Sequence, residues 1–117
     1  MHTVLIIDDS KTSRSVLRNI MEEHGYEVVA EAENGQEGYE KYCELKPDLV
    51  TLDITMPIMD GIETLVKIKE FDVSAKVIMV TAAGQKNKML EAIRLGAAEF
   101  VTKPFETGQI INIIESL

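Results

Sequence analysis

Short runs of β-branched residues alternate with helical patterns along the whole chain, and this alternation limits the possible folds more than any other feature. The runs that predict strands cover residues 3–7, 27–32, 48–52, 76–80 and 99–102. Apolar residues recur at helical spacing over residues 10–24, 36–45, 62–69, 86–95 and 107–117. Strands separated by helical patterns of this length imply a parallel sheet with right-handed crossovers and helices on both faces. We therefore predict a three-layer α/β/α domain with a doubly wound, five-stranded parallel sheet in the flavodoxin-like order 2-1-3-4-5.

Individual residues refine the predicted helices. Gly25 and Gly96 are expected to end the first and fourth helices, and Pro47 ends the second. In the fourth helix, the spacing predicts that Leu90 and Ile93 point toward the core. Inside the second helix, Gly38 costs about 1 kcal/mol relative to alanine, without an evident functional reason.

Charge and cysteine content exclude several classes of protein. The 117 residues suffice for one domain, residues 1–117, and a formal net charge of −8 argues against nucleic acid and anionic membranes as partners. The single cysteine, Cys43, forbids an intrachain disulfide and is expected to be a small buried hydrophobe. The chain shows neither a signal peptide nor an apolar run of the ~18–20 residues that cross a bilayer, so we expect a cytoplasmic protein.

Polar side chains follow the predicted strands at the edge where ligands bind in such sheets. Asp8 and Asp9 follow the first strand, Asp53 the third, Thr81 the fourth and Lys103 the fifth. Neighbouring strands lie ~4.8 Å apart, so the carboxylates of Asp9 and Asp53 should almost touch. The lysine begins ~10 Å from Asp53, two strands away, and its stem spans much of that gap. One crevice would then hold three carboxylates, a hydroxyl and an ammonium group.

Three carboxylates so close together repel one another unless a cation compensates them. Mg²⁺ takes oxygen ligands and is usually held by one or two carboxylates together with phosphate oxygens. A carboxylate can also serve as the nucleophile in phosphoryl transfer, while lysine neutralises charge. Taken singly, each residue has an ordinary structural explanation, such as a helix cap for aspartate or a solvated surface position for lysine. Their convergence on one sheet edge favours the functional interpretation.

Four segments together resemble the receiver domain of two-component response regulators. They are Ile6–Ser10, Asp53–Gly61 (with the pattern D-x-x-M-P-x-M-D-G), Val80–Ala82 and Lys103–Phe105. The resemblance covers essentially the whole chain. Because no further domain follows, the chain is similar to the CheY-type single-domain regulators of chemotaxis.

The resemblance implies a role for each acidic residue. Asp53 would be the phosphoacceptor. Asp9, Asp53 and the backbone carbonyl of Thr55 would bind Mg²⁺, or alternatively Mn²⁺, and Asp8 would act through a metal-bound water.

The resemblance also implies roles near the fourth and fifth strands. Lys103 would pair with the phosphoryl group and Thr81 would move to hydrogen-bond it. The Lys103–Pro104 peptide bond would be cis, a state that is accessible before proline. Phe100 occupies the position of a switch aromatic, without the hydroxyl that a tyrosine would supply.

The implied function is a phosphoacceptor switch rather than an enzyme, although it would catalyse its own phosphorylation and dephosphorylation. It would take a phosphoryl group from the phosphohistidine of a histidine kinase and change its binding to an output protein, such as a flagellar motor switch, with a phosphatase as a further candidate partner. We expect a monomer. The predicted output face comprises the fourth helix, the fifth strand and the fifth helix, with candidate contacts Lys86, Lys88, Met89, Phe100 and Gln109.

Three alternatives remain open at this level. The chain could be the receiver of a longer response regulator or hybrid kinase. A Mg²⁺-dependent phosphohydrolase of the haloacid dehalogenase type would need the pattern D-x-D-x-T, and Asp53–Thr55 lacks its second aspartate. A flavin or nucleotide binder would need a glycine-rich loop after the first strand, which Ser10–Ser15 does not supply.

Overall fold

The computed structural model describes residues 3–117, which form five strands and five helices. The strands are β1 (Thr3–Ile7), β2 (Glu27–Ala32), β3 (Leu49–Leu52), β4 (Val77–Ala82) and β5 (Glu99–Lys103). The helices are α1 (Lys11–Glu23), α2 (Gly35–Leu45), α3 (Gly61–Phe71), α4 (Lys86–Arg94) and α5 (Thr107–Glu115). Each element lies within two residues of its predicted bounds. No helix in the described part of the chain is long and apolar enough to cross a membrane.

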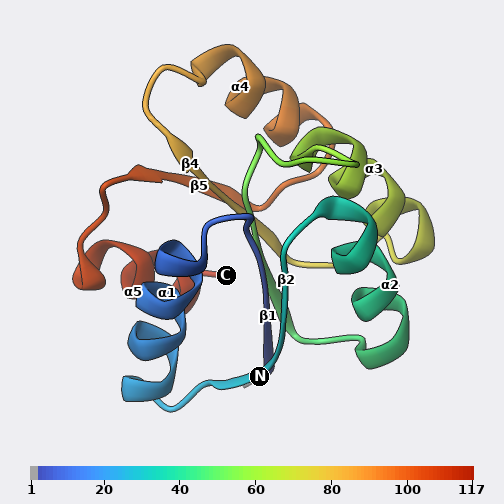
Figure 1. Cartoon of the computed structure of the whole chain (residues 1–117). Coiled ribbons are helices and arrows are strands. Elements are labelled where there is room, and N and C mark those ends of the chain that lie inside the picture. Colours follow the sequence, from blue (N-terminus) through green and yellow to red (C-terminus); the bar gives the residue numbers. More distant parts are fainter. Residues whose placement is uncertain (1–2) are drawn as a thin grey trace.

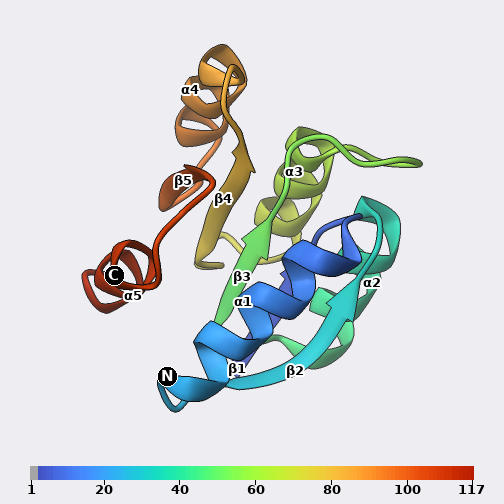
Figure 2. The same ribbon diagram turned by 60° about the vertical axis from the view of Figure 1, so that its left-hand side comes forward.

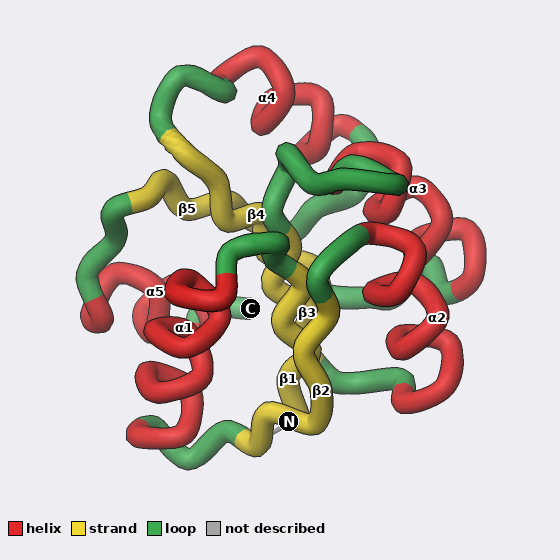
Figure 3. Tube along the Cα trace, viewed as in Figure 1, coloured by secondary structure: helices red, strands yellow, loops and turns green. Residues whose placement is uncertain are grey.

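All strands belong to one parallel sheet in the order β2-β1-β3-β4-β5, which confirms the predicted topology. Figure 1 shows α1 and α5 on one face of this sheet and α2 and α3 on the other. The fourth helix, α4, contacts α3 and β5 and belongs to the α2–α3 side. The turned view in Figure 2 shows the strands between these two helical layers. The loops that leave the carboxyl ends of β1, β3 and β4 gather at one edge of the sheet (Figure 3).

Two apolar clusters fill the space between the layers, because side chains alternate between the faces of each strand. In β1, Leu5 and Ile7 pack toward α2, α3 and α4, whereas Val4 and Ile6 pack toward α1 and α5. All four side chains are at most 1% exposed. This burial on both faces explains why the strand consists of a continuous apolar run.

Side-chain caps begin three of the helices. The side chains of Ser10, Asn34 and Asp60 accept hydrogen bonds from the backbone N–H groups at the starts of α1, α2 and α3. These caps satisfy donors that have no partner inside the helix. They therefore fix where each helix leaves the edge of the sheet at which the acidic residues lie.

The prediction of which residues of α4 face the core is wrong. Leu90 and Ile93 are 45% and 38% exposed, whereas Met89 and Ala92 are buried. Both pairs have the same three-residue spacing, so periodicity alone does not distinguish them. The helix packs against α3 and β5, which directs the smaller pair inward. Cys43 is half-buried rather than fully buried.

Candidate functional site

The acidic residues converge at the carboxyl edge of the sheet because β1 and β3 end in register. Ile7 pairs with Leu52, so Asp8 and Asp53 follow at the same level on adjacent strands. Asp8, Asp9 and Asp53 each offer a carboxylate oxygen, and these oxygens lie within 4.8 Å of one another. The structure thus brings together the three carboxylates that the sequence placed in one crevice.

Asp8 is the most enclosed of the three carboxylates, at 1% exposure. Its Oδ1 accepts a hydrogen bond from the backbone N–H of Ser10 at 2.8 Å. Its Oδ2 accepts one from Nζ of Lys103, also at 2.8 Å. Asp9 is exposed, so the cluster is open to solvent on that side.

Asp53 lies beside the same lysine. Its Oδ1 accepts a hydrogen bond from the backbone N–H of Ile54 at 2.8 Å, and its Oδ2 lies 3.5 Å from Nζ of Lys103. Burial, followed by the negative charge of Asp8, raises the pKa of the Asp53 carboxyl above its ordinary value. Burial alone would lower the pKa of Lys103, but the hydrogen bond to Asp8 and the charge of Asp53 outweigh it and raise that pKa. The lysine therefore stays charged and only partly compensates the cluster.

The donor set fits a divalent metal ion. Three ionised carboxylates and one ammonium leave a formal charge of −3 + 1 = −2. All the ligand atoms are oxygens, which suits a hard cation such as Mg²⁺. The exposed Asp9 would leave room for the water ligands that this ion retains.

The remaining predicted site residues lie at or just beyond the carboxyl ends of β3, β4 and β5. Thr81 is buried near the end of β4, one residue before Ala82, which pairs with Lys103 on β5. The Lys103–Pro104 peptide bond is cis. Thr55 is exposed, and its hydroxyl accepts a long hydrogen bond of 3.4 Å from Nε2 of Gln85.

The candidate output residues differ in how far they are exposed to solvent. Lys86, Lys88 and Gln109 are exposed, and the half-buried Phe100 packs against the cluster on the α2–α3 side of the sheet. Met89 is only 5% exposed, so its predicted place among the output contacts is wrong. It is a core residue because it occupies the inner face of α4.

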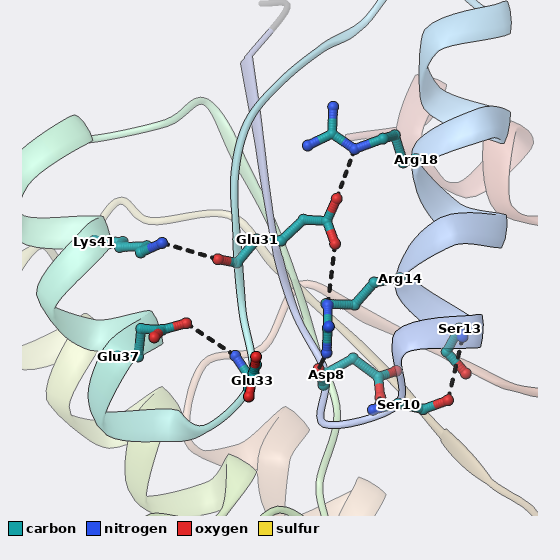
Figure 4. Close-up of polar contacts among 9 residues, drawn as sticks. All are labelled: Asp8, Ser10, Ser13, Arg14, Arg18, Glu31, Glu33, Glu37 and Lys41. Atoms are coloured by element: carbon teal, nitrogen blue, oxygen red, sulfur yellow. Dashed lines mark hydrogen bonds and ion pairs between the residues drawn. The ribbon is translucent and has the colours of Figure 1, made fainter.

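One residue that contacts the site was not predicted from the sequence. Arg14 on α1 is buried, and its Nη1 donates a hydrogen bond of 2.7 Å to the backbone carbonyl of Asp8 (Figure 4). The sequence feature that could have predicted its burial is helical spacing. Arg14 stands three residues before Leu17 and seven before Met21, on the inner face of α1. An arginine at such a position implies a buried partner for its charge.

A family model described as the response regulator receiver domain matches residues 4–115 of the chain. The chain therefore belongs to the response regulator receiver family, the phosphoacceptor domains of two-component signalling. This match agrees with the parallel sheet and with the acidic cluster at its edge.

Among its relatives, the chain is similar to chemotaxis proteins named CheY. It is 50% identical to the CheY of Listeria monocytogenes over 98% of this chain and 97% of that protein. It is 48% identical to the CheY of Bacillus subtilis over 97% of this chain and 94% of that protein. A solved complex of CheX, CheY, BeF₃ and magnesium from Borrelia burgdorferi matches with a TM-score of 0.95 and 38% identity, over 98% of this chain and 87% of that chain.

Proposed function

We propose that this chain is a CheY-like regulator of chemotaxis that accepts a phosphoryl group on Asp53 from the phosphohistidine of a histidine kinase. The observation that carries the proposal is the position of the Asp53 carboxylate, which lies close to the carboxylates of Asp8 and Asp9 and 3.5 Å from the ammonium group of Lys103. The extended similarity to CheY proteins supports the assignment to chemotaxis.

The transfer would proceed by attack of an Asp53 oxygen on phosphorus. The new O–P bond forms as the N–P bond of the phosphohistidine breaks, and the imidazole leaves with the electron pair. Ile54, whose N–H donates to Oδ1 of Asp53, orients the carboxylate. Lys103 lies within reach to neutralise charge on the phosphoryl oxygens.

We assign the metal site to Asp9, Asp53 and the backbone carbonyl of Thr55, with Asp8 acting through water. A bound Mg²⁺, or Mn²⁺, would supply positive charge to the transferring phosphoryl group. The same residues would support transfer to water, so that the protein catalyses its own phosphorylation and dephosphorylation while serving as a switch.

The switch would act through Thr81 and Lys103, which would gain contacts with a phosphoryl group on Asp53. A change in the packing of Phe100 would then alter the predicted output face, which is formed by α4, β5 and α5. There an output protein, such as a flagellar motor switch, or a phosphatase would bind. The solved complex of CheX with a related CheY supports a protein partner of this kind.

The proposal extends to the organisation of the chain. We propose one receiver domain over residues 1–117, of which residues 1–2 lie outside the described part. It would act as a monomer in the cytoplasm, where it would meet the kinase. Gel filtration and cell fractionation test these two properties.

The experiment is labelling with acetyl phosphate or a phosphorylated kinase in the presence of Mg²⁺, followed by intact-mass analysis. Wild-type protein should gain about one phosphoryl group per chain, and Asp53→Asn should gain none. Asp60→Asn is the matched control, because asparagine preserves the cap of α3 and the substitution removes one carboxylate from the same loop. Labelling of the Asp53→Asn variant would refute Asp53 as the acceptor.

Two further outcomes separate the alternatives. Repeated turnover of generic phosphomonoesters would indicate a phosphohydrolase instead. Asp9→Ala should weaken Mg²⁺ binding in a calorimetric titration, and an unchanged affinity would remove Asp9 from the metal site.

A further inference from the structure

Arg14 is a buried charged residue whose contacts join the edge strand β2 to the acidic cluster. It is 9% exposed. Its Nη1 donates to the backbone carbonyl of Asp8 at 2.7 Å, and its Nε donates to Oε1 of Glu31 at 3.0 Å (Figure 4). A buried guanidinium is costly unless it is paired and hydrogen-bonded, so these two contacts determine where the side chain lies.

Glu31 holds the guanidinium in place. Its second carboxylate oxygen accepts a hydrogen bond of 2.6 Å from Nε of Arg18, and its backbone carbonyl accepts one of 3.0 Å from Nζ of Lys41. Burial alone would raise the pKa of Glu31, but the hydrogen bonds from Arg18 and Arg14 outweigh it and lower that pKa. The carboxylate is therefore charged and fixed between two arginines of α1.

A β-bulge in β2 directs Glu31 toward α1. The pairing with β1 shifts between Val28 and Ala30, so that Val29 is an extra residue in β2. Val28 packs in the cluster facing α1 and α5, whereas Ala30 packs against the opposite cluster. Without the extra residue, strict alternation from Val28 would place Glu31 on the face away from Arg14.

The contact between Arg14 and Asp8 acts on more than one residue. The Asp8 carbonyl belongs to the planar peptide unit that also contains the nitrogen of Asp9. A hydrogen bond to this carbonyl therefore restrains rotation of the Asp8–Asp9 peptide plane, and the orientation of this plane determines where the Asp9 side chain points. The side chain of Asp8 is already held by Ser10 and Lys103, so Arg14 restrains the one backbone group of this residue that points toward α1.

We propose that Arg14, oriented by Glu31, is a positioning residue that clamps the Asp8–Asp9 peptide and aims the Asp9 carboxylate at a divalent cation. The identity of the ion rests on the proposed function, whereas the clamp consists of contacts made within the chain. Loss of a group that orients a metal ligand typically weakens metal binding by about 10- to 100-fold.

The first test compares Arg14→Met with Arg18→Met by calorimetric titration with Mg²⁺. Both substitutions keep an aliphatic stem and remove one hydrogen bond to Glu31, but only the first removes the contact with Asp8. Arg14→Met should weaken Mg²⁺ binding about tenfold, and Arg18→Met should stay within about twofold of wild type. Equal affinities in the two variants would overturn the proposal.

The second test uses the metal-free protein and amide hydrogen exchange measured by NMR. The N–H of Ser10 donates to Oδ1 of Asp8, so its protection reports on the order of the acidic loop. Exchange at Ser10 should accelerate in Arg14→Met and not in Arg18→Met, and identical rates would overturn the clamp. If wild-type protein binds no Mg²⁺, the proposed function fails, while this comparison still decides the role of Arg14.

A third variant covers the case in which Arg14→Met does not fold. Glu31→Gln keeps an acceptor for Arg14 but removes the charge that fixes it. It should weaken Mg²⁺ binding several-fold relative to Arg18→Met, and it should accelerate exchange at Ser10. Values equal to those of Arg18→Met would overturn the proposal.

Discussion

Replacing Gly38 by alanine should destabilise the protein, although alanine is the better helix former. A β-carbon at this position in α2 would lie 2.5 Å from Cδ1 of Ile7 and 2.8 Å from both Cγ1 and Cγ2. Ile7 is 1% exposed, so its side chain could move away only by pressing against other core residues. The glycine that carried no functional explanation in the sequence is thus required by the close approach of α2 to β1.

The magnitude follows from two opposing effects. Overpacking a dense core costs about 1–3 kcal/mol, and contact with three atoms of a fully buried side chain places Gly38→Ala at the upper end. The gain in helix propensity offsets about 1 kcal/mol of this cost. The net loss in the free energy of unfolding should be about 2 kcal/mol, which for this size of domain lowers Tm by about 8 °C.

Thermal and urea unfolding followed by circular dichroism provide the assay, with Gly108→Ala as the matched control. A β-carbon at Gly108 in α5 meets no atom of the described residues within 4 Å, so this variant should gain up to about 1 kcal/mol. A double-mutant cycle tests the contact directly, because Ile7→Val removes Cδ1, the atom nearest the added β-carbon. Ile7→Val should destabilise the Gly38→Ala protein by at least about 0.5 kcal/mol less than it destabilises the wild-type protein. A Gly38→Ala protein as stable as wild type would refute the close-packing argument.

Three further substitutions test other features of the structure. Thr51→Val should stabilise the protein by about 1 kcal/mol in urea unfolding, because the buried Thr51 hydroxyl has no hydrogen-bond partner among the described residues; a loss of stability would contradict this. Ile58→Gly should raise stability by about 0.5 kcal/mol, because Ile58 is 80% exposed and has φ 71°, a conformation that costs a branched residue about 1–2 kcal/mol; an unchanged Tm would argue against such strain. Gly61→Ala should cost about 3 kcal/mol and reduce phosphoryl uptake in the labelling assay, because the added β-carbon would press against the backbone carbonyl of Asp53; normal uptake and stability would show that the loop can shift.

The order of the strands and the place of the acidic residues were predictable because both depend on patterns local to the chain. Strand and helix periodicity indicated the alternation, and the topology then brought Asp8, Asp9 and Asp53 to one edge. The reach of Lys103 was also foreseeable, because strand spacing sets the gap and the stem crosses it. Its Nζ lies 3.5 Å from Asp53.

The features that were missed depend on contacts between elements distant in sequence. The inner face of α4 could not be predicted from spacing, because two apolar pairs in this helix have the same spacing. Packing of α4 against α3 and β5 determines which pair is buried. The bulge at Val29 leaves no clear pattern in the sequence, yet it determines which face Glu31 occupies. The contact of Arg14 with Asp8 then follows from that bulge and from the inward position of Arg14 on α1.

The partners of Lys103 show how one pocket would serve both the cation and the phosphoryl group of the proposed function. Its ammonium donates to Asp8 at 2.8 Å and lies 3.5 Å from Asp53, so it already compensates one of the three negative charges. The remaining formal charge of −2 equals in magnitude the charge of one divalent ion. If Asp53 accepts a phosphoryl group as proposed, the added negative charge would draw the ammonium of Lys103 from Asp8 toward the new oxygens, and that contact would distinguish the two states. The lysine would therefore compensate the pocket in one state and bind the phosphoryl group in the other, because the acidic cluster holds it within reach of both.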